Sequence, residues 1–183
     1  VQTCALSDLQ VSAFISTYSA DVSGVCSALY ELGGMTIMHD ASGCNSTYNT
    51  HDEPRWYDMD SMVYISGLSE MEAIMGDDKK LIQDIVSAAS DLHPKFIAIA
   101  GTPIPMMIGT DLRAIAEMIE KQTGIVTFGI QTNGMHSYLC GAAEAYAQIV
   151  KRFTLTGIPI KAKSVNVLGA RSEEHTSELQ SQP

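Results

Sequence analysis

The chain has 183 residues, of which 45% are hydrophobic, and this is enough for one domain with a substantial core. Its formal net charge of -10 excludes the basic surface that a nucleic-acid binder needs to neutralise a row of phosphates. No apolar run approaches the roughly 20 residues that cross a bilayer, and no basic and apolar leader opens the chain, so we expect a cytoplasmic protein without a membrane partner.

The first predicted elements are a helix over residues 25–32 and, after Gly33 and Gly34, a buried strand over residues 35–39. The polar segment from Asp40 to Trp56 is predicted to be a loop at the exit of this strand. Residues 61–66 suit a second strand.

A helix is predicted after Gly76 and ends before Pro94. A strand over residues 95–100 follows, and Gly101, Thr102 and Pro103 break it. The helix has a core-facing stripe formed by Leu81, Ile82, Ile85, Val86, Ala89 and Leu92.

The pattern then repeats with a helix that Thr110 or Asp111 caps and that Gly124 ends. A strand over residues 125–130, a loop over 131–134, a helix from Leu139 to Val150 and a strand over 165–168 complete the series. This alternation predicts an α/β, Rossmann-like fold, in which helices cover both faces of a mostly parallel sheet. Ligands of such sheets gather at the carboxyl ends of the strands, here the loops that begin at Asp40, Gly101 and Gln131.

Several motifs are absent from the sequence. It has no Gly-x-Gly-x-x-Gly turn for a dinucleotide, no phosphate loop for ATP, no Gly-x-Ser-x-Gly elbow and no closely spaced His pair for zinc. Dinucleotide-dependent and hydrolase functions therefore have no support.

The cysteines are the remaining candidates for chemistry. Cys26 and Cys44 flank the first predicted strand, and the chain can bring them together at the edge of the sheet. Thiolates suit iron–sulfur clusters, zinc or copper, whereas buried Cys also packs as a small hydrophobe. Cys4 and Cys140 could pair with them in disulfides if the protein were secreted, but a domain with this much core needs no such staples.

Residues 24–29 and 38–44, which hold Cys26 and Cys44, resemble the paired cysteine segments of the nitrogenase component 1 superfamily. In that family the first cysteine opens a helix and the second ends a His-Gly/Ala-x-x-Gly-Cys loop. Residues 76–81 are similar to its Gly-Gly-x-x-Lys-Leu segment, and residues 108–112 to its Ile-Gly-Asp-Asp turn.

The resemblance implies that Cys26 and Cys44 bind an electron-relay iron–sulfur cluster at the interface of two related subunits. Thr102 stands where nitrogenase subunits have a third cysteine, which favours a 4Fe-4S cluster that takes two cysteines from each subunit of a homodimer or of a pair with a paralogous component 1 subunit. An ATP-hydrolysing iron-protein reductase would deliver the electrons, and the substrate would react in domains beyond residue 170, so we expect the chain alone to be inactive.

Two other functions stay open: a scaffold that holds a metallocluster during assembly without turnover of its own, and a small-molecule binder whose cysteines are structural. His136 is the weak candidate for an acid or base. His39 suits a hydrogen-bonded structural role and Cys140 packing against the sheet. The loop after Cys44 could line a substrate cavity or a reductase-docking face through His51, Glu53, Arg55 and Trp56, or simply be solvated.

The last residues of the chain differ in composition from the rest. Residues 1–170 are predicted to form the first α/β domain of a longer protein. Residues 171–183 resemble the translation of a sequencing-library adapter, although their Ser, Glu and Gln content also fits a polar disordered tail.

Overall fold

The computed structural model describes residues 20–41, 45, 60–76 and 78–154. Cys4, Cys44 and the loop residues 46–59 lie outside this part of the chain, as do the predicted strand 165–168 and the tail 171–183. In chain order the elements are α2 (Ala20–Leu29), β1 (Met35–His39), β2 (Met62–Ile65), α3 (Glu70–Met75), α4 (Asp78–Leu92), β3 (Ile97–Gly101), α5 (Pro103–Ile108), α6 (Leu112–Thr123), β4 (Thr127–Ile130) and α7 (Tyr138–Phe153).

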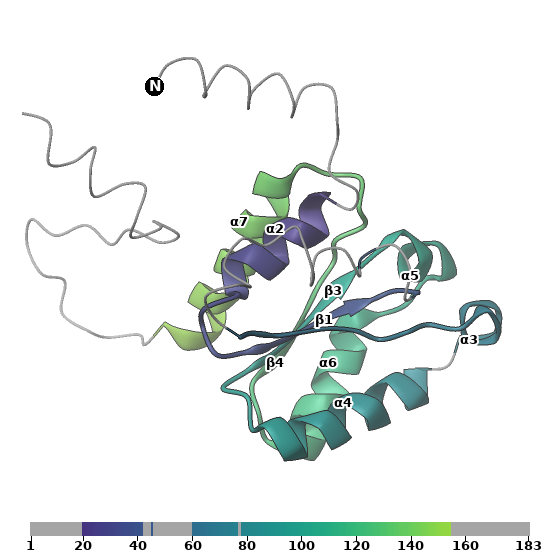
Figure 1. Cartoon of the computed structure of the whole chain (residues 1–183), viewed down its shortest axis with the longest axis horizontal. Helices are drawn as coiled ribbons and strands as arrows, with labels where there is room; N and C mark the ends of the chain where they lie inside the picture. Colours follow the sequence, from purple (N-terminus) through teal and green to yellow (C-terminus); the bar gives the residue numbers. More distant parts are fainter. Residues whose placement is uncertain (1–19, 42–44, 46–59, 77, 155–183) are drawn as a thin grey trace, which may run out of the picture.

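The four strands form one parallel sheet in the order β2-β1-β3-β4. Helices α2 and α7 cover one face, and α4 and α6 cover the other (Figure 1). The predicted α/β fold with a parallel sheet between two helical layers is therefore confirmed. Among the described residues, no helix is long and apolar enough to cross a membrane.

Each face of the sheet has its own hydrophobic core, because successive strand side chains point to opposite faces. On the α2 face, Met38, Ala98 and Ala100 pack with Val22, Val25, Cys26 and Leu29 of the helix. On the other face, Ile37, Ile97 and Ile99 pack against Leu81, Ile85, Ile115 and Ile119 of α4 and α6. The continuous burial of β1 and β3 reflects this two-sided cover.

Helices α2 and α7 touch backbone to backbone. A Cβ atom added to Gly24 would lie 2.0 Å from the Tyr138 carbonyl oxygen, and one added to Gly141 would lie 1.8 Å from the Asp21 carbonyl oxygen. Only glycine permits this approach, so the two glycines set the position of α2 on α7.

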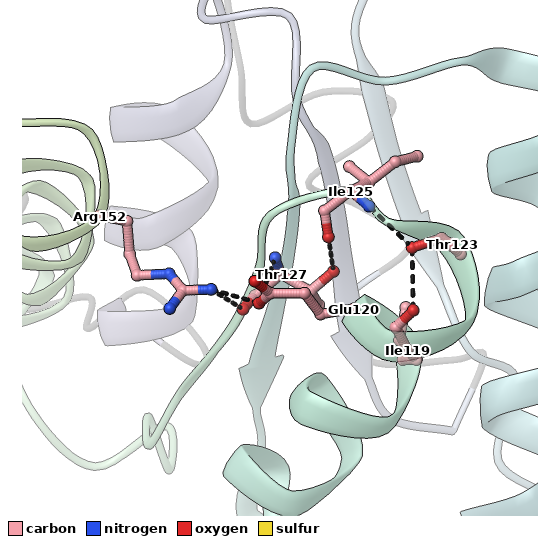
Figure 2. Close-up of polar contacts among 6 residues, drawn as sticks. All are labelled: Ile119, Glu120, Thr123, Ile125, Thr127 and Arg152. Carbon is pink, nitrogen blue, oxygen red and sulfur yellow. Dashed lines mark hydrogen bonds and ion pairs between the residues drawn. The ribbon is translucent and has the colours of Figure 1, made fainter.

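The outer edge of β4 is closed at its start by side chains (Figure 2). Glu120 of α6 accepts a hydrogen bond from the Thr127 N–H at 3.2 Å, and Arg152 of α7 donates to the Thr127 carbonyl at 3.5 Å. Arg152 and Glu120 also form an ion pair. The clamp ties both helical layers to β4, which is an edge strand among the described residues, and it bonds peptide groups of Thr127.

Three local predictions differ from the structure. The first helix ends at Leu29, and the chain then turns, so Leu32 lies outside it with 40% of its surface exposed. The strand breaks where predicted, but helix α5, which was not predicted, starts at Pro103, because proline suits the first helical turn, where its missing N–H costs nothing. Helix α3 was not predicted, although Ser69 and Glu72 form a capping box at its start.

Candidate functional site

The carboxyl ends of β1 and β3 form the switch point of the sheet, because the chain leaves β1 toward β2 on one side while β3 lies on the other. Hydroxyl groups tie the strand ends together here. Thr102 Oγ1 donates to the His39 carbonyl at 2.8 Å, and Thr132 Oγ1 donates to the Gly101 carbonyl at 2.7 Å. The three strand exits that were predicted to gather ligands therefore lie at one edge of the sheet and are joined by these two hydrogen bonds.

Cys26 is the seventh residue of α2, and its side chain is 0% exposed. It belongs to the core on the α2 face of the sheet together with Met38 and Ala100. The alternation of side chains places Thr102, whose backbone is still extended, on this same face two residues after Ala100. The candidate thiol and the residue aligned with a third thiol thus share one face, but Cys26 lies within the helix rather than at its start.

Cys44 lies outside the described residues, but its neighbour Asn45 is placed. Asn45 is buried and donates from Nδ2 to the Asp40 carboxylate just after β1. The same alternation puts Asp40 on the face of Met38, which is the face of Cys26. Asn45, the residue after Cys44 in the sequence, is therefore anchored at the switch point.

His39 points to the opposite face from Met38, toward α4, and is 4% exposed. Its Nδ1 lies 2.9 Å from Ser66 Oγ, which also accepts the Asp40 N–H at 3.1 Å. Burial lowers the pKa of His39 below its ordinary value of 6.5, although the carboxylates of Asp78, Asp40 and Glu72 oppose the shift. A neutral, hydrogen-bonded imidazole on the other face suits the structural role.

His136 is exposed in the loop between β4 and α7, and its Nε2 lies 3.4 Å from Asn133 Nδ2. Cys140 is exposed in the first turn of α7, where its sulfur accepts a hydrogen bond from Ser137 Oγ at 3.3 Å. The prediction that Cys140 packs against the sheet is wrong, because α7 turns its small residues Gly141 and Ala145 inward against α2.

Asp21 is a buried carboxylate that the sequence reasoning missed. It is 1% exposed, and its oxygens accept N–H groups from Val22 at 2.9 Å, Asn133 at 3.1 Å and Gly134 at 2.7 Å. The sequence shows an acidic residue at the start of a helix and, far along the chain, an Asn-Gly turn. Nothing in the sequence indicates that the two are in contact.

Six large apolar side chains are exposed on α3 and α5, two short helices in contact with each other. Both helices follow strand exits, so this methionine-rich surface lies beside the switch point (Figure 1). The surface consists of Met71, Ile74, Met75, Met106, Met107 and Ile108, of which Met107 is 81% exposed. Exposed apolar patches are typical of surfaces that contact other proteins, membranes or ligands.

The donor chemistry suits a thiolate-bound cluster but does not complete one within the described residues, where no three His, Cys, Asp or Glu side chains gather around a common point. The Thr102 hydroxyl is already used to bond the His39 carbonyl. A cluster held by Cys26 therefore needs ligands beyond those that the described residues bring together.

Comparison with known proteins finds a family model, described as nitrogenase component 1 type oxidoreductase, that matches residues 22–181. Curated relatives include nitrogenase iron-molybdenum cofactor biosynthesis protein NifE from Methanococcus maripaludis, 28% identical over 75 residues that make up 41% of this chain and 16% of the relative. The protein of that name from Klebsiella pneumoniae is 26% identical over 120 residues, 63% of this chain and 26% of the relative.

Solved structures of nitrogenase Cp1 at pH 5 and pH 6.5 share the fold at 20% identity, with TM-scores of 0.62 and 0.65. They cover 75% and 81% of this chain, which matches 30% and 31% of theirs. The chain thus spans less than a third of the length of each of these proteins.

Proposed function

The chain belongs to the family of nitrogenase component 1 type oxidoreductases, and from this membership we propose that it is the iron–sulfur domain of a nitrogenase-like reductase. Proteins of this family bind metal–sulfur clusters and work with partner subunits and a reductase. In the proposed role the domain receives electrons from an ATP-hydrolysing iron protein and relays them to a substrate site elsewhere in the full-length protein. The supporting observation is a family match over residues 22–181 with Cys26 on the core face next to the switch point.

Cys26 and Cys44 are the proposed ligands, and two such pairs from a homodimer or from a paralogous partner complete the four thiolates of a 4Fe-4S cluster. When bound, this cluster supplies one-electron transfer. The chain's own contribution is to hold Cys26 in a dry apolar core, a setting that influences a cluster's reduction potential. Thr102, with its hydroxyl bonded to His39, adds no ligand.

The methionine-rich surface on α3 and α5 is the proposed docking site for the iron protein. Electron transfer requires the donor to approach the cluster, and this surface flanks the strand exits at which the cluster is proposed to lie. Its exposed apolar side chains suit the dry centre of a protein interface.

His136 is the proposed proton donor to a reduced substrate, whose site in the rest of the full-length protein would face this edge of the domain. It is exposed at the exit of β4, on the same edge of the sheet as Thr102, and histidine is the most frequent general acid and base in enzymes. In this role His136→Gln would lower turnover without changing the iron content.

The proposal is tested by anaerobic purification of the full-length protein and analysis of its iron and sulfide. We expect about one four-iron cluster per two chains. Cys26→Ala and Cys44→Ala should each abolish iron binding, whereas Cys140→Ala, which removes an exposed thiol, should leave it unchanged. A metal-free wild-type protein, or a Cys26→Ala variant with full iron content, would overturn the ligand assignment.

A second candidate function is a scaffold that holds a metallocluster during assembly, because both curated relatives above are named as cofactor biosynthesis proteins. A scaffold should pass its cluster to an acceptor protein and show no steady turnover with reductase and ATP. Turnover without loss of the cluster would support the reductase function. Transfer of the cluster without turnover would support the scaffold function.

A further inference from the structure

Asp21 connects two parts of the molecule that are more than a hundred residues apart in sequence. Its carboxylate accepts the N–H groups of Asn133 and Gly134 in the loop between β4 and α7, as well as that of Val22 in its own helix. Three N–H donors suit a carboxylate, which only accepts hydrogen bonds. Because Asp21 is 1% exposed, water does not replace these bonds easily.

The backbone of the same region is tightly packed. Gly24 and Gly141 bring α2 and α7 into direct contact, so the start of α2 cannot shift without moving α7 or the loop before it. Asp21 therefore acts within one tightly packed unit that contains Cys26 of α2 and His136 of the loop.

Asp21 and Cys26 lie five residues apart on the same helix. Five residues of helix correspond to about 7.5 Å along its axis. A buried negative charge at this separation, with little solvent screening, disfavours the addition of an electron to a group bound at Cys26.

We propose that Asp21 is a positioning residue that couples the helix of Cys26 to the loop of His136 and lowers the reduction potential of a cluster bound at Cys26. The second part rests on the proposed function. The first part rests on the geometry alone.

The test compares Asp21→Asn with Asp111→Asn. Asp111 is a matched control, because its carboxylate also accepts two backbone N–H groups at a helix start, those of Arg113 and Ala114, but it is exposed. Amide hydrogen exchange is measured on the metal-free proteins. The reduction potential is measured on the reconstituted full-length proteins by a titration followed by electron paramagnetic resonance.

We expect Asp21→Asn to speed exchange at Asn133 and Gly134 about tenfold, the effect of losing one buried hydrogen bond, and to raise the potential. Asp111→Asn should change neither. In the wild type, loading the cluster should slow exchange at Asn133 and Gly134 but not at Arg113 and Ala114, and this comparison serves if Asp21→Asn does not fold.

Unchanged exchange at Asn133 and Gly134 in Asp21→Asn overturns the coupling. A cluster in Asp21→Asn with the wild-type potential overturns the effect on the cluster. An iron-free wild-type protein overturns the proposed function instead, and the exchange comparison on the metal-free proteins still decides the coupling.

Discussion

At the residue scale, threonine hydroxyl groups hold the strand ends together at the switch point by donating hydrogen bonds to backbone carbonyls. Thr102, which the resemblance aligns with a third cysteine, is 0% exposed and ties β3 to β1 through the His39 carbonyl. In this chain Thr102 therefore has a structural role, which is to bond the two strands through its hydroxyl group.

Replacing this hydroxyl should destabilise the fold. Thr102→Val keeps the shape but removes the side-chain hydrogen bond to the buried His39 carbonyl, which still belongs to the ladder between β1 and β3, and we expect a loss of about 0.5–1.5 kcal/mol in the free energy of unfolding. Urea denaturation followed by circular dichroism measures the change. Thr154→Val, at an exposed position, should stay within about 0.5 kcal/mol of the wild type, and equal losses in the two variants would contradict this explanation.

His39 should make stability depend on pH. Because burial lowers its pKa in the folded state below the ordinary 6.5, the unfolded chain binds the proton more tightly. Its contribution to stability is therefore fully present above pH 6.5 and is lost as the pH falls through the pKa of the folded state.

The measurement is the free energy of unfolding in urea between pH 5 and pH 8, a range of about one and a half units on either side of the ordinary histidine value. His39→Asn should flatten the acid side of the profile, whereas the exposed His136→Asn should leave it unchanged. A profile for His39→Asn that matches the wild type would show that another group sets the dependence.

At the element scale, helix α2 is placed by glycine rather than by large side chains. Alanine is ordinarily the better helix former, by about 1 kcal/mol over glycine. Gly24→Ala should nevertheless destabilise the protein by about 1–3 kcal/mol, because the new methyl group would overlap the Tyr138 carbonyl. Unfolding in denaturant shows directly whether the free energy of unfolding rises or falls.

Ser87→Ala, on the exposed side of α4, is the control for helix propensity and should be neutral or slightly stabilising. If Gly24→Ala were also stabilising, the contact between α2 and α7 would be looser than the structure indicates.

The same scale explains which elements could be predicted. Strands β1, β3 and β4 and helices α4, α6 and α7 follow from apolar periodicity and from local signals such as the Asp111 cap and Gly124. Helices α3 and α5 were not predicted because each has only six residues and leaves most of its large apolar side chains exposed, so neither shows a buried stripe.

At the scale of the whole molecule, the methionine-rich surface should govern association with the reductase. Met75→Glu and Met107→Glu place charges in the proposed interface and should weaken binding of the iron protein at least tenfold, as loss of a central apolar contact does elsewhere. Binding of the full-length variants is measured by calorimetry or by a sensor assay.

Met118→Glu on α6, in the helical layer that covers the opposite face from α2, is the matched control and should bind like the wild type. Unchanged binding in both Met75→Glu and Met107→Glu would place the reductase elsewhere. The division into a domain of residues 1–170 and a tail of residues 171–183 stays a prediction, since part of it lies outside the described residues.

The sequence by itself determined the alternation of elements, the parallel sheet, the strand exits as the functional edge and the family, because these depend on local periodicity and on short motifs. Only the tertiary structure decided which residues share a face: Cys26 with Thr102, and His39 on the opposite side. It also exposed Cys140 and joined Asp21 to Asn133 and Gly134. Such contacts depend on how a helix is rotated on the sheet, and here glycines that admit a neighbouring backbone set that rotation.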